Sequence, residues 1–172
     1  MNQFPTTQIK ITPLGGAPNV HDNMWVYESD NDIFIVDCGM GFPEEGVSGV
    51  DLTIPDISYL KDKQSKIRGF VVTHGHEDHI GGFPYIIPQM REGIPIYTSK
   101  LAAGFLNEKF REFRIDSKIL NVVKDRQPIM LGDFEVKMIP VTHSVPDTKH
   151  LIVKTPMGNI YHGSDFKFDW TP

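Results

Sequence analysis

The sequence predicts an α/β fold, and three observations support this prediction. Residues 33–38 and 68–73 are nearly all apolar, which is typical of strands buried within a sheet. Residues 100–114 carry apolar side chains at the spacing of a helix. Residues of metal-binding type follow the ends of three apolar strands, and open α/β sheets build their sites at such an edge.

The first half of the chain predicts four strands, one long loop and two helices. Strands are expected over residues 9–14, 24–28, 33–38 and 68–73, a Gly-, Pro- and acid-rich surface loop over 40–56, and helices over 56–63 and 79–90. Asp56 is the expected N-cap of the first helix. Pro84 fits the second helix only within its first turn, because proline lacks the N–H that a helix interior needs.

The second half predicts five strands and one helix. Strands are expected over residues 94–98, 119–123, 133–141, 151–154 and 159–162, the last two forming a hairpin. The helix covers residues 100–114, and its apolar stripe is expected to face the core rather than a cofactor. The stripe consists of Leu101, Phe105, Leu106, Phe110 and Phe113.

Composition limits the classes of protein to consider. A chain of 172 residues with 40% apolar content is long and apolar enough to form one domain with a hydrophobic core. The net charge of −5 argues against a basic nucleic-acid module held by phosphate contacts alone, but bound divalent metals can supply the missing positive charge. The single Cys38 excludes an internal disulfide and fits the cytoplasm. We expect no signal peptide and no membrane span.

Charge is unevenly distributed along the chain. Residues 22–62 carry ten acidic side chains against Lys61 alone, and residues 100–126 carry seven basic side chains against four acidic ones. The basic region is either a contact for a polyanion or an ordinary solvated helix face. We favour the ordinary face.

The densest group of chemically active residues is Thr-His-Gly-His-Glu-Asp-His at positions 73–79. In extended chain, His74 and His76 point to the same side and can share one ion. Asp78 and His79 come after the chain begins to turn, so they can point at a second ion. Two ions about 3.5–4 Å apart form a hydrolytic site. The alternative, a polar loop whose histidines cap a helix, is disfavoured by the specific spacing.

Two further candidate ligands follow strands later in the chain, namely His143 and Asp165. Asp37 ends the strand over residues 33–38, and its expected role is to bind loop amides and hold neighbouring ligands in place. Two other histidines have no such placement. We expect His150 on the surface at the start of a strand, and we leave the role of His162 open.

These motifs resemble a known family. His-x-His-x-Asp-His after a strand, then a lone His and a strand-terminal Asp, resembles the metallo-β-lactamase fold. The flanking motifs resemble the ribonuclease J-like nucleases of the β-CASP family. They are DCGM at 37–40, GVDLTIPD at 49–56, THGHEDHIGG at 73–82, HSVPD at 143–147 and DFKFDWTP at 165–172.

The resemblance implies an αββα sandwich, with residues 1–172 as the N-terminal part of a metallo-β-lactamase domain that is C-terminally incomplete and lacks the β-CASP domain. It implies two zinc ions, with manganese as an alternative metal. By position, the first ion would be held by His74, His76 and His143, the second by Asp78 and His79, and Asp165 would bridge both. A metal-bound hydroxide would attack the phosphorus, with Asp78 orienting it.

The sequence departs from this family in two ways. The family's β-CASP insertion, and a further histidine that binds the second metal, would lie beyond the present chain. We therefore expect a weakened second metal site, an exposed sheet edge and association with a like or complementing chain. Residues 17–22 replace a more Gly-rich segment, and His21 there is expected to be a plain loop residue rather than a substrate contact.

The function implied is hydrolysis of RNA phosphodiesters, by exonuclease or endonuclease action, in the cytoplasm and with RNA as the partner. Two alternatives remain open. One is a small-molecule hydrolase of thioesterase or β-lactamase type, which gains weight because no β-CASP domain is present to hold RNA. The other is a non-catalytic module that binds a metal or a partner chain.

Overall fold

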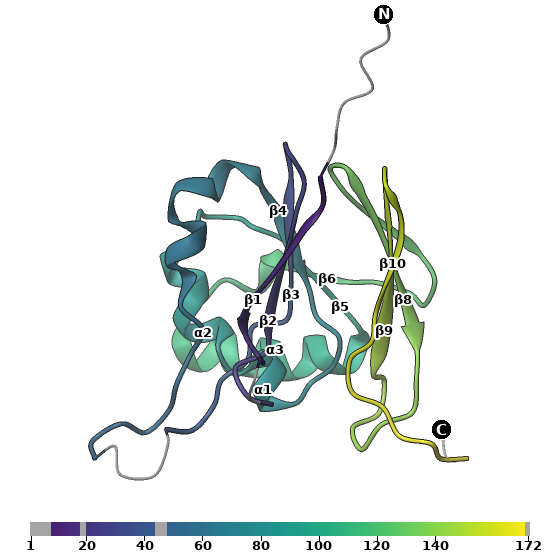
Figure 1. Cartoon of the computed structure of the whole chain (residues 1–172). Helices are drawn as coiled ribbons and strands as arrows, with labels where there is room; N and C mark the ends of the chain where they lie inside the picture. Colours follow the sequence, from purple (N-terminus) through teal and green to yellow (C-terminus); the bar gives the residue numbers. More distant parts are fainter. Residues whose placement is uncertain (1–7, 18–19, 44–47, 171–172) are drawn as a thin grey trace, which may run out of the picture.

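The structure, a computed structural model, describes residues 8–17, 20–43 and 48–170. Helices, a six-stranded sheet and a four-stranded sheet lie in three successive layers (Figure 1). These layers correspond to an αββ portion of the predicted αββα sandwich. In the described part of the chain, no helix is long and apolar enough to cross a membrane.

The six-stranded sheet has the order β1-β2-β3-β4-β5-β6. Its strands are β1 (Lys10–Gly15), β2 (Met24–Glu28), β3 (Ile33–Val36), β4 (Ile67–Val71), β5 (Ile96–Thr98) and β6 (Leu120–Val122). The first three strands pair antiparallel, and β3 to β6 pair parallel. The carboxyl ends of β3 to β6 therefore meet at one edge of the sheet, where sites of open α/β sheets are built.

The four-stranded sheet is antiparallel, with the order β10-β9-β8-β7. Its strands are β7 (Pro128–Leu131), β8 (Phe134–Pro140), β9 (Lys149–Thr155) and β10 (Gly158–His162). The helices are η1 (Ile57–Lys66), α1 (Glu77–Ile80), α2 (Phe83–Ile86), η2 (Ile87–Gln89), α3 (Lys100–Phe113) and η3 (Ser117–Ile119). All predicted strands are present, and β7 is a strand that the sequence interpretation missed.

The strand β3 separates two hydrophobic cores. Ile33 and Ile35 belong to the core beneath the helices, whereas Phe34 and Val36 belong to the core between the two sheets. Successive side chains of a strand point to opposite faces, so one short apolar strand supplies both cores. The prediction that this strand is buried on both faces is confirmed.

The predicted helix over residues 79–90 is wrong, because the segment forms α1, α2 and η2 instead. A Cβ atom at Gly82 would lie 2.3 Å from the carbonyl oxygen of Gly39, and the Gly82 N–H donates to the Cys38 carbonyl at 2.9 Å. Because the Gly82 N–H bonds to this loop and the Asp78 carbonyl accepts from Asn23 instead, the helical hydrogen bonding is interrupted after α1. Pro84 lies in the first turn of α2, as expected.

Two helices differ in detail from their predictions. Residues 57–66 form a 3-10 helix, and Asp56 is its N-cap as predicted, accepting the Ser58 N–H at 2.8 Å. In α3 the buried face is formed by Ala102, Leu106 and Phe110 with Ala103. Phe105 and Phe113 are exposed, so the prediction that the whole apolar stripe faces the core is wrong for these two residues.

Candidate metal centre

Three strand ends deliver the candidate ligands to one place. His74 follows β4 after two residues, His143 follows β8, and Asp165 follows β10. The first of these strands belongs to the six-stranded sheet and the other two to the four-stranded sheet. The ligands therefore meet where the two sheets face each other.

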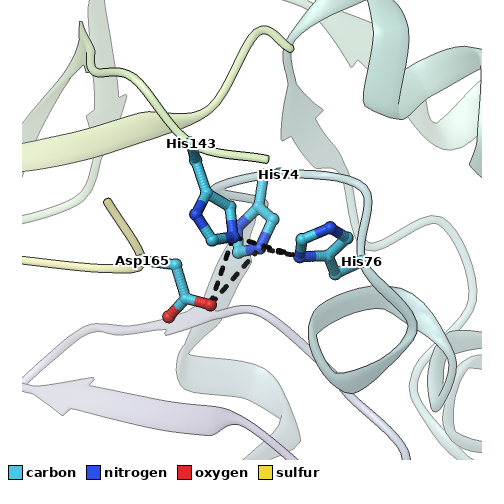
Figure 2. A group of neighbouring side chains, drawn as sticks. All are labelled: His74, His76, His143 and Asp165. Carbon is cyan, nitrogen blue, oxygen red and sulfur yellow. Dashed lines mark hydrogen bonds and ion pairs between the residues drawn. The ribbon is translucent and has the colours of Figure 1, made fainter. Parts of the chain in front are cut away.

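The first ligand group consists of His74, His76, His143 and Asp165, whose side chains point toward one another (Figure 2). His74 Nε2 lies 3.1 Å from His76 Nδ1, which lies 3.2 Å from His143 Nε2. Asp165 Oδ2 lies 3.4 Å from His143 Nε2 and 4.0 Å from His74 Nε2. In a tetrahedral zinc site with bonds of ~2.0–2.1 Å, ligand atoms lie roughly 3.3 Å apart. The spacing therefore fits a single ion.

The second ligand group consists of Asp78, His79 and Asp165. His79 Nε2 lies 3.5 Å from Asp78 Oδ2 and 3.8 Å from Asp165 Oδ1. Asp165 thus directs one oxygen to each group, as a bridging carboxylate does. The structure brings together all six residues that the sequence singled out as ligands.

Asp37 holds His79, a member of the second ligand group, in place. It is buried and adopts a left-handed backbone with φ of 60°. Its Oδ2 accepts the His79 Nδ1–H at 2.7 Å, and its Oδ1 accepts the Thr73 N–H at 2.7 Å. A His whose Nδ1–H is bound in this way presents Nε2 to a metal. The role expected for Asp37 is confirmed.

The same carboxylate also orients the first group through Thr73. The Thr73 hydroxyl donates to Asp37 Oδ2 at 2.8 Å, so its oxygen can accept the Nδ1–H of His74, 3.0 Å away. Ser164, next to Asp165 in the chain, donates to the same oxygen at 3.0 Å. His74 Nε2 is therefore the nitrogen left free for an ion.

The pKa shifts of the buried histidines have opposite directions in the two groups. Burial lowers the pKa of His74 to about 3, and the charge of His79 contributes. Burial also lowers the pKa of His143. Burial acts against charge on His79 as well, but the Asp37 carboxylate outweighs it and raises the pKa of His79. His74 and His143 therefore offer neutral imidazoles at neutral pH, as metal binding requires.

Asn23 is part of the site although the sequence interpretation did not identify it. Its side-chain nitrogen lies 3.4 Å from Asp78 Oδ2 and 3.3 Å from His79 Nε2. Its backbone N–H donates to the Asp78 carbonyl at 2.9 Å and its carbonyl accepts the Gly39 N–H at 2.9 Å. An isolated Asn before a strand gives no sequence signal for this contact, because only the fold brings it to α1.

The remaining histidines lie outside both ligand groups. His21 is exposed on a loop, and His162 accepts or donates a 2.8 Å hydrogen bond with the Tyr27 hydroxyl. The prediction that His150 lies on the surface is wrong, because it is only 4% exposed. It belongs to β9, where its ring packs against Tyr161 and Phe166.

A family model of the metallo-β-lactamase superfamily matches residues 18–155. The chain belongs to this superfamily. Solved structures agree on the fold: the metallo-β-lactamase fold protein YhfI of Bacillus subtilis is similar with a TM-score of 0.61 at 18% identity, covering 89% of this chain and 60% of YhfI. A protein of unknown function from Enterococcus faecalis is similar with a TM-score of 0.70 at 19% identity, over 92% and 44% of the two chains.

Within the metallo-β-lactamase superfamily, this chain is similar in sequence to ribonucleases J. It is 41% identical to that of Helicobacter pylori strain 26695 over 100% of this chain and 25% of the relative. It is 41% identical to that of Thermus thermophilus over 98% of this chain and 30% of the relative. It is 35% identical to ribonuclease J2 of Bacillus subtilis over 100% of this chain and 31% of the relative. The chain thus spans between a quarter and a third of the relatives' length.

Proposed function

We propose that the chain is a metal-dependent hydrolase that cleaves RNA phosphodiester bonds. The observation that carries this proposal is the pair of ion-sized ligand groups joined by Asp165, in a chain 35–42% identical to ribonucleases J. We assign two zinc ions, with manganese as an alternative metal. The free thiol of the buried Cys38 supports a cytoplasmic setting, where thiols stay reduced.

Each candidate ligand has a defined task in this proposal. His74, His76 and His143 would hold one ion, Asp78 and His79 would hold the other, and Asp165 would contribute an oxygen to each. When bound, the ions lower the pKa of a water molecule and neutralise charge on the phosphate.

The remaining tasks fall to groups beside the ligands. Asp78 would orient the attacking water. Asn23 holds the Asp78 backbone and directs its amide at the Asp78 carboxylate. Asp37 and Thr73 keep both imidazoles in the tautomer that leaves Nε2 free.

A substrate panel tests this function directly. The purified chain, loaded with zinc or manganese, is given a 5′-phosphorylated RNA, a thioester and a β-lactam. We expect cleavage of the RNA alone, and loss of this cleavage in His76→Ala. Intact RNA, together with a His76→Ala effect on turnover of another substrate, would instead support a small-molecule hydrolase. No turnover of any substrate would support the third alternative, a non-catalytic module that binds a metal or a partner chain.

Variants of single ligands should remove the two ions separately. His143→Ala removes a nitrogen from the first group only, and Asp78→Ala removes an oxygen from the second group only. Each variant should retain about half of the bound metal and lose more than ~100-fold in cleavage rate, since even outer partners of ligands contribute 10–100-fold. Elemental analysis and equilibrium dialysis measure the stoichiometry, and His21→Ala is the matched histidine control. Equal loss of both ions in each variant would contradict two separable sites.

Acid should release the two ions in a defined order. A proton competes with the metal at each imidazole, and it competes better where the pKa is higher. The pKa of His79 is raised, whereas the pKa of His74 is lowered to about 3. On lowering the pH, the second ion should therefore leave before the first, in a dialysis titration followed by metal analysis. Release in the opposite order would refute the assignment of His79 to the weaker group.

A further inference from the structure

The loop that carries His143 lies between two strands and is fixed by few backbone bonds. We define the His143 loop as residues 141–148, between the end of β8 and the start of β9. Its base is tied to the six-stranded sheet, because the Lys149 N–H donates to the Thr73 carbonyl at 2.9 Å. His143 lies six residues before that bond in the chain, so its position depends on a further anchor.

Asp147 anchors the His143 loop to the first turn of α3. Its Oδ2 accepts the Leu101 N–H at 3.3 Å. The N-cap residue of α3, Ser99, makes no side-chain capping bond, so the carboxylate of a distant segment takes that role. A negative charge at this end of a helix is also favoured by the helix dipole. The contact therefore stabilises α3 and the loop together.

Asp147 has a second partner, the ammonium group of Lys149. Its Oδ1 lies 2.7 Å from Lys149 Nζ, and Asp125 Oδ1 lies 2.6 Å from the same nitrogen. The Lys149 side chain is 4% exposed, so a plain structural role for Asp147 would be to neutralise this buried charge. Asp125 does the same, but of the two carboxylates Asp147 alone also bonds to α3 in the described part of the chain.

Further along, α3 contacts the other chain segment of the first ligand group, residues 74–77. A Cβ atom on Gly75 would lie 2.4 Å from Cδ2 of Phe105, so the Phe105 ring lies directly against the Gly75 backbone. One turn later on α3, the Lys109 ammonium pairs with Glu77 at 2.7 Å. The segment that bears two of the histidine ligands thus packs along the same helix as the His143 loop.

The two loops need a common support because their strands belong to different sheets. His76 follows the six-stranded sheet and His143 the four-stranded sheet, yet their ring nitrogens lie 3.2 Å apart. We propose that α3 aligns these two ligands. Asp147 positions His143 by holding its loop against the first turn of α3. Phe105 positions His76 by holding its segment against the next turns. This inference rests on the proposed function, because it takes the first ligand group to bind an ion.

The zinc affinity of each ligand group by itself tests the role of Asp147. The Asp78→Ala chain keeps the first group intact, and competition with a chelator measures its affinity. Adding Asp147→Gly removes the carboxylate without straining the left-handed backbone, whose φ is 67°. This should weaken zinc binding about 10-fold, the lower end for outer partners of ligands. Asp147→Asn keeps an oxygen for the Leu101 N–H and should restore most of the affinity.

The second ligand group gives the matching measurement. The His143→Ala chain keeps Asp78, His79 and Asp165, and Asp147→Gly should leave its zinc affinity unchanged. An equal loss in both groups would overturn the proposal, since Asp147 would then support the fold in general. Failure of the Asp78→Ala chain to bind zinc would overturn it as well.

Asp125→Ala is the matched control for Asp147→Gly. It removes the other carboxylate partner of Lys149 and leaves the contact with α3, so zinc affinity should not change. In each variant Lys149 retains one anionic partner, so the fold should persist, which thermal unfolding of the metal-free chain checks. Equal losses of affinity in the two variants would overturn the proposal, because Asp147 would then act through Lys149 alone.

Phe105→Ala tests the other contact with α3 and does not depend on Asp147. Phe105 is 42% exposed, and its truncation should weaken zinc binding in the Asp78→Ala chain several-fold. Phe113→Ala is the control, because Phe113 is 45% exposed on the same helix and packs on Tyr85 instead. Retained affinity in Phe105→Ala would overturn this part of the proposal.

The double variant tests whether both residues act through α3. Once one loop is released, the helix no longer sets the distance between the two ligands, so releasing the other costs less. Asp147→Gly with Phe105→Ala should therefore lose less affinity than the product of the two single losses. A loss equal to that product would show two independent contacts and overturn the common support.

RNA cleavage by the wild-type chain is measured separately, because the zinc affinities are obtained without RNA. Unchanged affinities together with cleavage by the wild type would reject the role of α3 and retain the proposed function. The expected affinity losses without any cleavage by the wild type would do the reverse.

Discussion

Replacing Asp165 by alanine should abolish metal-dependent cleavage and lower the amount of metal bound at both ligand groups. Asp165 Oδ2 faces the first group and Oδ1 faces the second, so one substitution removes an oxygen from each. The cleavage rate should fall by well over ~100-fold, which exceeds the effect of losing an outer partner of one ligand. Single-turnover cleavage of labelled RNA and metal analysis of the dialysed protein measure the two effects.

Asp62→Ala is the control for Asp165→Ala, because Asp62 is an exposed carboxylate on η1 outside both ligand groups. It should leave cleavage and metal content unchanged. Retention of two ions in Asp165→Ala would show that the carboxylate is not shared between them.

Asp37→Asn should cause the largest loss of stability among substitutions that preserve side-chain shape. Asparagine tolerates the left-handed backbone at this position, so the change removes the charge and one accepting oxygen without straining the backbone. Loss of the Asp37 carboxylate leaves the buried imidazole of His79 without its anionic partner, and breaking a buried pair typically costs about 3–5 kcal/mol. Urea unfolding of the metal-free protein measures the difference, and Asp30→Asn on an exposed turn is the control.

The destabilisation in Asp37→Asn should depend on pH with a defined sign. Burial raises the pKa of Asp37, but His79 and other partners outweigh it and lower this pKa, so the stability contributed is lost as the pH falls through the folded-state value. The pKa of His79 is raised, so its contribution is lost as the pH rises through its folded-state value. The difference between wild type and variant should be greatest between about pH 4 and pH 6.5, the ordinary values for the two groups. A difference constant from pH 3 to pH 9 would contradict this pairing.

The grouping of the candidate ligands could be predicted from sequence because its signals are local. His74, His76, Asp78 and His79 lie within six residues, and the strand before them fixes which way they point. Asp165 follows a strand whose apolar residues are recognisable on their own. Because strand ends converge at a sheet edge, ligands that are far apart in the sequence are also brought together.

Other features depend on contacts between distant segments and could not be read from local patterns. The break after α1 arises because the Gly82 N–H bonds to the Cys38 carbonyl, which belongs to a segment about forty residues earlier. Asn23 joins the site only through its contact with Asp78. His150 is buried because Phe166 and Tyr161 cover it. Helical periodicity and spacing carry no information on such encounters.

The candidate ligands are divided between the two sheets, so a bound ion would connect the sheets structurally as well as chemically. His74, His76, Asp78 and His79 follow the six-stranded sheet, whereas His143 and Asp165 follow the four-stranded sheet. An ion bound to either group would therefore contact residues from both layers, and its binding free energy would add to the free energy of unfolding. Under the proposed function, removal of the metal would destabilise the fold and abolish the activity together.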